Sequence, residues 1–313
     1  MGSTAEPYLL RLGQRLTTGL SRLDESARQR QRTFVLSRQN ADGGFSGREG
    51  ESDLYYTGFA VRGLSVLGCL SPEDADRIAP FLRQQTRAQL TVIDLVSWLY
   101  SAVMVQAANG VDLLAEFDSQ WPARLAEILE SFRTPDGGYA KTHEGSAGST
   151  YHSFLVALCY ELIGQTLPKP NRLVQFVYDR QRDDGGFVEI QPMKRGGTNP
   201  TAAAVALLRM HNGLDDEIRS DVRHFLRQVK SGEGGFQANT RIPFADSLST
   251  FTGLLTAQDL GFDDLLDPVQ TEQLIASLEF PEGGFRGALW DQAADVEYTF
   301  YALGVRGLLG SQR

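Results

Sequence analysis

The chain has 313 residues, a formal net charge of −9 and a hydrophobic fraction of 42%. This balance is typical of a globular protein; it excludes an intrinsically disordered chain and gives no overall basic field for nucleic acid. No apolar run reaches the length of a membrane span, and Cys69 and Cys159 stand isolated in apolar stretches. We therefore expect a cytoplasmic protein with reduced thiols, no nucleic-acid partner and no membrane span.

Residues 1–26 form a lead-in to the rest of the chain. An amphipathic helix is expected around Tyr8 to Leu20, where it would cover one end of the main domain. Everything from residue 27 to residue 313 is expected to form a single domain, because one repeated motif runs through it.

The motif is an acidic residue, two glycines and an aromatic residue. It occurs at Asp42 to Phe45, Asp136 to Tyr139, Asp184 to Phe187, Glu233 to Phe236 and Glu282 to Phe285. Successive copies are 94, 48, 49 and 49 residues apart, so the first step is two repeats long. The sequence therefore predicts six repeats of about 48 residues, of which the second, centred near residue 90, has lost its motif.

Each repeat predicts two helices joined by the glycine pair, which ends a helix because glycine adopts the left-handed conformation freely. Before the glycines the pattern is amphipathic, as at 222–229; after them it is apolar nearly all round, as at 151–163. The first type predicts an outer layer of helices and the second an inner layer. The last helix, from 295 to 309, is as apolar as the middle ones, which favours a closed ring over an open solenoid.

The repeat period and its acidic-Gly-Gly-Phe loop resemble the prenyltransferase and squalene-cyclase repeat family. Within it, residues 39–48 and 295–300 resemble the loops and inner-helix starts of protein prenyltransferase β subunits, especially of the type II geranylgeranyl enzyme. The resemblance implies an all-α (α/α)6 barrel, or toroid, of six helix hairpins with an aromatic-lined central cavity. It also implies, for active members, a catalytic zinc at the rim and a basic patch that binds isoprenoid diphosphate.

The resemblance implies three zinc-binding positions, and at two of them this chain has a residue other than the family's zinc ligand. The first is Asp246, which keeps the carboxylate; the second is Leu248, which has no lone pair; and the third is Tyr298 in place of a histidine. We expect no zinc cofactor, with zinc-dependent prenyl transfer reduced or lost. Asp246 and Tyr298 remain the candidate catalytic residues of a rearranged site.

The diphosphate site that the resemblance implies has also lost most of its binding residues. Its histidine position is Ser146, with His143 one turn away, and its basic residues are reduced to Arg241. Aromatic residues and one histidine at the inner-helix starts predict a pocket for a long apolar chain, with barrel core as the alternative. The candidate ligand-binding residues are Tyr56, Trp98, His143, Tyr151, His152, Arg241, Phe251 and Tyr301.

Two sets of aspartates have a local explanation. Asp53, Asp246 and Asp295 each stand four residues before a threonine, either as carboxylates at the cavity rim or as helix N-caps. The stretch from Asp263 to Asp267 matches the DDxxD pattern of isoprenoid synthases, but a loop and helix start between two repeats explains it better.

Three hypotheses for function follow. The first is a prenyltransferase β-subunit-like protein that binds an isoprenoid, an isoprenoid diphosphate or another apolar small molecule, and the second is an active geranylgeranyl or farnesyl transferase with a rearranged site. The third is a terpene-cyclase-like enzyme or a non-catalytic barrel that binds a helical, α-subunit-like protein. The Asp-x-Asp-Asp acid of the family's cyclases does not occur in the chain.

Overall fold

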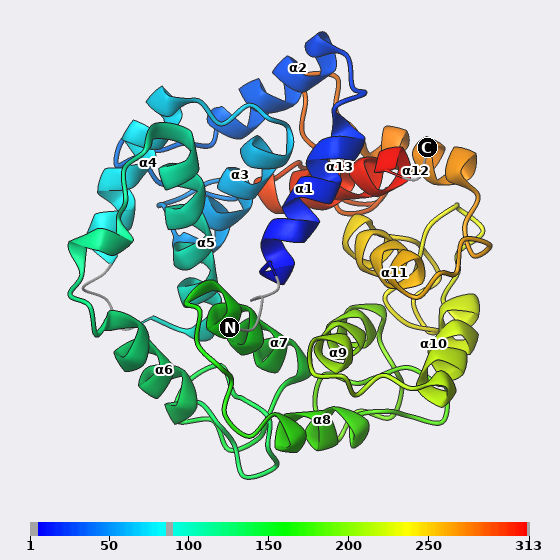
Figure 1. The fold of residues 1–313 in the computed structure, drawn as a ribbon. Coiled ribbons are helices and arrows are strands. Elements are labelled where there is room, and N and C mark those ends of the chain that lie inside the picture. Colours follow the sequence, from blue (N-terminus) through cyan, green and yellow to red (C-terminus); the bar gives the residue numbers. More distant parts are fainter. Residues whose placement is uncertain (1–5, 86–89, 312–313) are drawn as a thin grey trace.

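Two concentric layers of helices make up the computed structural model, which describes residues 6–85 and 90–311 (Figure 1). The inner helices are α3 (Leu54–Val66), α5 (Val92–Asn109), α7 (Thr150–Leu162), α9 (Thr198–Met210), α11 (Ser247–Asp259) and α13 (Val296–Ser311). The outer helices are α2 (Glu25–Leu36), α4 (Pro72–Gln85), α6 (Trp121–Ser131), α8 (Pro170–Tyr178), α10 (Asp216–Gln228) and α12 (Pro268–Leu278). A short 3-10 helix, η1 (Leu114–Glu116), precedes α6.

The inner helices form a closed ring. Each packs against the next in chain order, and α13 packs against α3. The all-α (α/α)6 toroid predicted from the repeats is therefore confirmed over the open solenoid. Helix α5 is apolar and long enough to cross a membrane, but it lies in this ring between α3 and α7, as a core helix does.

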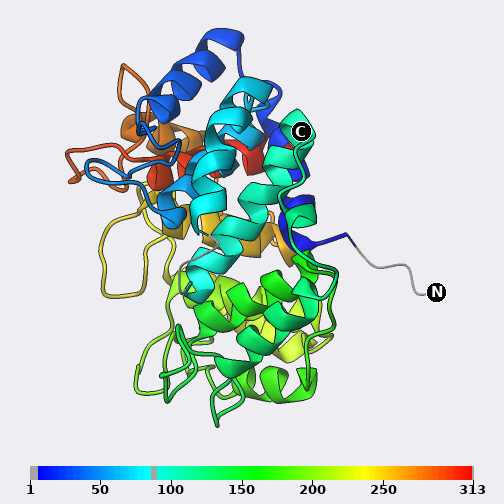
Figure 2. The ribbon, with the colours of Figure 1, turned by 90° about the vertical axis from the view of Figure 1, so that its left-hand side faces the viewer.

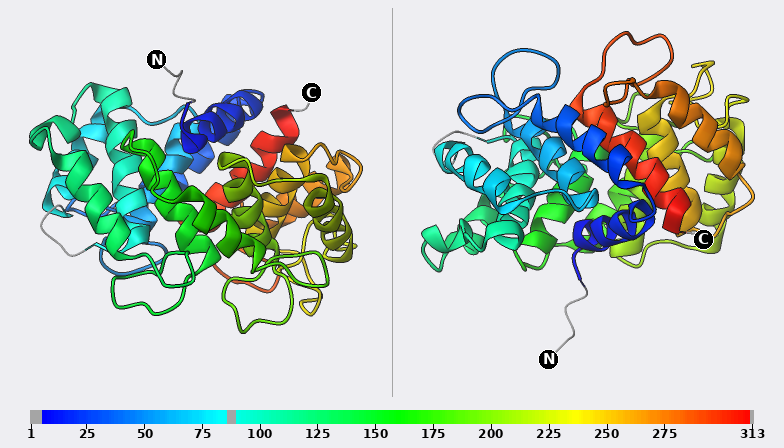
Figure 3. Two further views of the ribbon diagram at one scale, coloured as in Figure 1. Left: turned by 60° about the horizontal axis from the view of Figure 1, so that its bottom comes forward. Right: turned by 90° about the horizontal axis from the view of Figure 1, so that it is seen from above.

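Helix α1 (Tyr8–Leu20) lies across one end of the ring, against α13 and α3. The close packing needs glycine, because a Cβ at Gly19 would overlap the carbonyl oxygen of Gly307 on α13. The long loops project from the opposite end, which we call the glycine-loop end (Figures 2 and 3). The predicted covering helix is thus present, and the first outer helix begins at Glu25, just before the expected boundary at residue 27.

Each glycine loop is fixed by the same buried hydrogen bond. The amide of the loop aromatic donates to a hydroxyl on the inner helix that follows, as Phe45 does to Thr57 at 2.9 Å. The other four pairs are Tyr139 with Ser153, Phe187 with Thr201, Phe236 with Thr250 and Phe285 with Thr299. The hydroxyl satisfies a backbone donor that would otherwise be buried without a partner.

Each loop also covers the outer helix of the next repeat. A Cβ at Gly44 would lie 2.7 Å from the ring of Phe81 on α4, and a Cβ at Gly284 would lie 2.6 Å from the ring of Phe34 on α2. The last loop therefore covers the first repeat, which closes the outer layer as well as the inner one.

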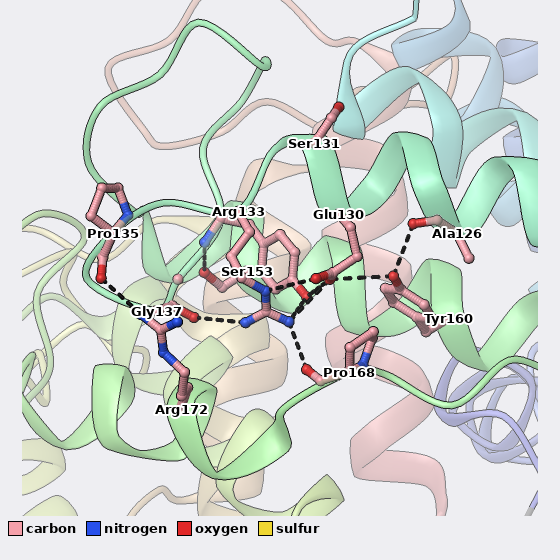
Figure 4. A network of polar contacts seen from close by, with 12 residues as sticks. Ala126, Glu130, Ser131, Arg133, Pro135, Gly137, Ser153, Tyr160, Pro168 and Arg172 are labelled. Carbon is pink, nitrogen blue, oxygen red and sulfur yellow. Dashed lines mark hydrogen bonds and ion pairs between the residues drawn. The ribbon is translucent and has the colours of Figure 1, made fainter.

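An arginine network strengthens the glycine loop of the third repeat (Figure 4). Arg133 forms an ion pair with Glu130 at 2.9 Å, stacks on the ring of Tyr139 and donates to the carbonyl oxygens of Gly137 and Pro168. The hydroxyl of Tyr139 donates to Glu130 as well. These contacts tie the loop to α6 and to the link before α8, so we assign the network a structural role.

Candidate functional site in the barrel lumen

A polar pair joins two neighbouring inner helices inside the ring. The Tyr55 hydroxyl on α3 donates to the Glu297 carboxylate on α13 at 2.7 Å. Burial raises the pKa of Glu297 above its ordinary value, although the hydrogen bond from Tyr55 opposes the shift. The lumen thus contains a carboxyl group that holds its proton to higher pH than an exposed glutamate does.

Tyr151 faces this pair from the far side of the ring. Tyr151 lies on α7, opposite α13. Burial is the main cause that raises the pKa of Tyr151; the charge of Arg62 lowers this pKa, and the charge of Glu297 raises it further. Those charges reach Tyr151 across the lumen. The Tyr151 side chain is 37% exposed. Tyr151 therefore keeps an exposed face in the first turn of α7.

Aromatic rings fill the lumen between α3, α11 and α13. Tyr301 lies 5.3 Å from Phe59 and 5.8 Å from Phe251, measured between ring centroids, and each of these side chains is buried. Phe251 and Tyr301 thus belong to the buried core between these helices, as the barrel-core alternative predicts, whereas Tyr151 keeps an exposed face.

Arg62 and Glu297 are lumen residues that sequence reasoning missed. The Arg62 guanidinium stacks on Phe59 and Tyr100, at 5.3 Å from each ring centroid, and its Nε is buried without a hydrogen-bond partner. Arg62 follows Tyr55 by seven residues, which is two turns along the same face of α3. A single charged residue at that spacing, in an otherwise apolar inner helix, is the sequence feature that could have predicted Arg62 as a lumen residue.

The rim aspartates are N-caps, as the local interpretation holds. Asp53 accepts from the amide of Tyr56, and Asp295 accepts from the amide of Tyr298. Asp246 accepts from the amide of Ser249 at 2.7 Å and from its hydroxyl at 2.8 Å. Both carboxylate oxygens of Asp246 are thus in use, and burial raises the pKa of Asp246.

The residues at the three zinc positions do not fit a zinc ion. The Asp246 carboxylate caps α11, Leu248 offers no donor, and burial raises the pKa of Tyr298 to about 12, which keeps its phenol protonated near neutral pH. Within residues 6–85 and 90–311, no three histidine, cysteine, aspartate or glutamate side chains gather in a metal-binding arrangement.

His152 and Tyr56 lie at the starts of inner helices. The Nδ1 of His152 is 2.7 Å from the Ser149 hydroxyl, and its buried Nε2 has no partner. Burial, with a smaller contribution from Lys141, lowers the pKa of His152 to about 4, so the imidazole is neutral near pH 7. Tyr56 packs against the first glycine loop at Gly47.

The two basic candidates for a diphosphate site are not joined by any contact in the described residues. Arg241 is exposed in the link before α11, whereas His143 lies 3.9 Å from Glu144 in the link before α7. The DDxxD stretch is peripheral too. Asp264 pairs with Arg223 at 2.8 Å, and Asp267 caps α12, which confirms the loop and helix-start interpretation.

A pocket of about 780 Å³ opens on the barrel wall between α5, α6 and the link before α7. We call it the wall pocket. It is lined by two of the expected ligand-binding residues, Trp98 and His143, and the Trp98 indole donates outward to the carbonyl oxygen of Leu82 on α4. Trp98 is expected from the sequence to line the central cavity and His143 to contribute to a diphosphate site. The structure places both on the wall, where the Trp98 indole faces the outer layer.

Solved structures with the same fold include isoprenoid enzymes and one glycosidase. Candida albicans protein geranylgeranyltransferase-I complexed with GGPP has a TM-score of 0.69 and 16% identity, covering 88% of this chain and 89% of that one. The type II terpene cyclase MstE from Scytonema, as a variant with geranylgeranyl dihydroxybenzoate, gives 0.61 and 16%, covering 96% and 99%. An inactive variant of an alpha-1,6-mannanase from Salegentibacter gives 0.57 and 11%, covering 96% and 98%. At these identities the likeness shows the fold alone.

Fold and lumen define an α-α toroid with an aromatic interior. The family model of the prenyltransferase alpha-alpha toroid domain matches residues 20–84 and 200–313. The chain belongs to this family. A search of curated proteins gave no match.

Proposed function

We propose that the chain binds an isoprenoid, an isoprenoid diphosphate or another long apolar ligand in the barrel lumen. The observation that carries the proposal is the exposed face of Tyr151 inside a ring of aromatic side chains. Aromatic and apolar walls with a few polar groups are the usual lining of such a site. Similar folds bind GGPP and a geranylgeranyl compound in two of the solved structures.

In this proposal, zinc-dependent prenyl transfer is reduced or lost. Transfer of that kind needs a metal-bound thiolate, and of the three zinc positions only Asp246 supplies a carboxylate, which already caps a helix. The alternative, an active geranylgeranyl or farnesyl transferase, would have to use a rearranged site that includes Asp246 and Tyr298. The purified protein is therefore expected to contain no stoichiometric zinc by elemental analysis; one zinc per chain would support the active transferase instead.

Thermal unfolding with geranylgeranyl diphosphate tests the lumen site. Saturating ligand should raise the melting temperature, because it binds only the folded protein. Tyr151→Trp, which fills the open side of the lumen, should abolish the rise, whereas Ile128→Trp in the wall pocket should keep it. The lumen proposal fails if geranylgeranyl diphosphate, farnesol and squalene all leave the melting temperature unchanged.

A cyclase-like reaction is the second candidate, because the raised pKa of Glu297 supplies an acid inside the aromatic lumen. Protonated Glu297 would donate its proton to an alkene carbon and become a carboxylate, and the resulting carbocation would face the aromatic rings. Incubation with squalene or geranylgeranyl diphosphate should then give cyclic products by gas chromatography–mass spectrometry. Glu297→Gln should abolish them; products that persist in this variant would reject Glu297 as the acid.

A protein partner is the remaining candidate, favoured by apolar side chains at the glycine-loop end. Trp290 is 65% exposed and packs edge-on against Phe244, while Ile190 and Met193 are exposed in the link before α9. A helical, α-subunit-like partner in the cytoplasm would cover such a surface, and both cysteines are free, as that compartment favours. Co-purification of a helical partner that Trp290→Ser abolishes would support this role; co-purification unaffected by the substitution would contradict it.

A further inference from the structure

The wall pocket lies where the missing glycine loop of the second repeat would pack. The other loops each cover one side chain of the next outer helix, namely Phe34, Phe81, Phe176, Phe225 or Leu274. Phe176 precedes the first glycine of its own repeat by nine residues, and the residue at that position in α6 is Ile128. Ile128 is 49% exposed and lines the wall pocket. The pocket is thus a packing site from which the covering loop has been lost.

The second repeat has a short link between its outer and inner helices. Helix α4 ends at Gln85 and α5 begins at Val92, so the link comprises residues 86–91, of which 86–89 lie outside the described residues. The first repeat uses residues 37–53 for the same connection and folds its glycine loop from them. A link of the shorter length cannot form such a loop.

The surface has also lost the group that receives a loop. In the five other repeats, a hydroxyl four residues after the helix N-cap accepts the amide of the loop aromatic, as Thr57 does after Asp53. In the second repeat the N-cap is Thr91, and four residues later stands Leu95. Leu95 lines the wall pocket. A peptide loop would find no acceptor there, whereas an apolar chain needs none.

The remaining lining fits an apolar chain as well. Trp98, Phe117 and Trp121 pack edge-on or tilted along one side, with ring centroids 5.7 and 6.2 Å apart. The lining also includes Leu90, Leu99, Leu125 and Phe132, with polar side chains that include Arg124, Thr142, His143 and Glu144. The volume of about 780 Å³ falls within the range of ligand pockets, roughly 300–1,000 Å³.

We propose that the wall pocket is a second binding site, separate from the lumen, for the apolar chain of a lipid-like small molecule. The chain would lie along Leu95, Ile128 and the three aromatic rings, in the place that a glycine loop occupies in the other repeats. This inference does not depend on the function proposed for the lumen.

Tryptophan fluorescence reads this pocket directly. Trp98 and Trp121 are two of the three tryptophans of the chain, and Trp290→Phe removes the third, which lies outside the pocket. Titration of the full-length Trp290→Phe protein with farnesol, and separately with dodecanoate, should change the fluorescence in a saturable way with at least one of the two. If neither probe gives a saturable change, the proposal is wrong.

Matched variants in the same background locate the binding. Ile128→Glu puts a charge into the pocket and should weaken binding at least tenfold, while Val269→Glu, at an exposed apolar position on another outer helix, should leave it unchanged. Tyr151→Ala, in the lumen, should also leave the titration unchanged. Ile128→Phe, which narrows the pocket and keeps it apolar, serves if Ile128→Glu fails a circular-dichroism test of folding. Binding that survives both Ile128 substitutions, or that Tyr151→Ala abolishes, would overturn the assignment.

Discussion

At the scale of single residues, the capping aspartates act within one helix start, whereas Arg62 and Glu297 act between helices. An N-cap is a local feature: Asp53 and Asp295 bond to amides three residues away, so the sequence alone shows the arrangement. Arg62 and Glu297 become neighbours of Tyr151 only because α3 and α13 face α7 across a closed ring. No spacing within one repeat contains that information.

The loop hydrogen bonds give the first prediction. Thr57→Val keeps the shape of the side chain but leaves the amide of Phe45 buried without an acceptor, which should cost about 1–3 kcal/mol of unfolding free energy. Urea denaturation measures the loss. Thr57→Ser keeps the hydroxyl, as Ser153 does in the third repeat, and should lose less. Equal stability of the valine variant and the natural chain would refute the role of this bond.

The buried carboxyl of Glu297 gives a prediction of pH dependence. Its pKa is raised in the folded state, so the stability that its protonated form contributes is present at low pH and is lost as pH rises through the raised pKa. Glu297→Gln stays neutral and can still accept from Tyr55. The variant should therefore gain melting temperature relative to the natural chain between pH 5 and pH 8. A difference that is constant with pH would contradict the raised pKa.

At the scale of elements, periodicity predicted both helix layers because apolar residues on one face or on all faces have a direct structural meaning. The covering helix α1 was predicted for the same reason. The wall pocket was missed, although the loss of the second motif was evident in the sequence. What a missing loop uncovers depends on the outer helix of the following repeat, and Ile128 looks in sequence like any residue of an amphipathic helix.

The glycine loops give a prediction at this scale. Gly43 has a φ of +89°, and a Cβ there would overlap the carbonyl oxygen of Arg77, whereas Gly68, with a φ of +66°, has nothing within 4 Å. Gly43→Ala should therefore cost about 3 kcal/mol or more, and Gly68→Ala only about 1 kcal/mol for the left-handed conformation. Chemical denaturation compares the two. Equal losses of unfolding free energy in the two variants would mean that Gly43 is needed for its left-handed backbone conformation and not for its close approach to α4.

At the scale of the whole molecule, α1 and α13 close one end of the barrel. Their contact depends on glycines, because Gly19, Gly307 and Gly310 let the two backbones meet. The sequence showed small residues in these helices, but it could not show that the two helices pack against each other, since almost the whole chain separates them.

This packing gives the final prediction. Gly19→Ala should push α1 away from α13 and break the ion pair between Arg15 and Asp259, so that trypsin cleavage after Arg15 becomes several-fold faster. Gly13→Ala is the matched control on the same helix, since a Cβ there would meet only the Tyr100 hydroxyl, at 3.3 Å, and no backbone atom of α13. Cleavage as slow in the Gly19 variant as in the Gly13 variant would show that the close approach does not hold α1 in place.

The seam between the last and first repeats also has a consequence for synthesis on the ribosome. Phe34 of α2 is covered by Gly284, and the amide of Gly284 donates to the Gln31 side chain at 2.8 Å. These partners are among the first and the last residues of the barrel to be translated. Repeats in the middle of the chain can pack as they emerge, but the first outer helix keeps an uncovered aromatic face until translation is nearly complete. A nascent chain of this protein therefore exposes that face for most of its synthesis.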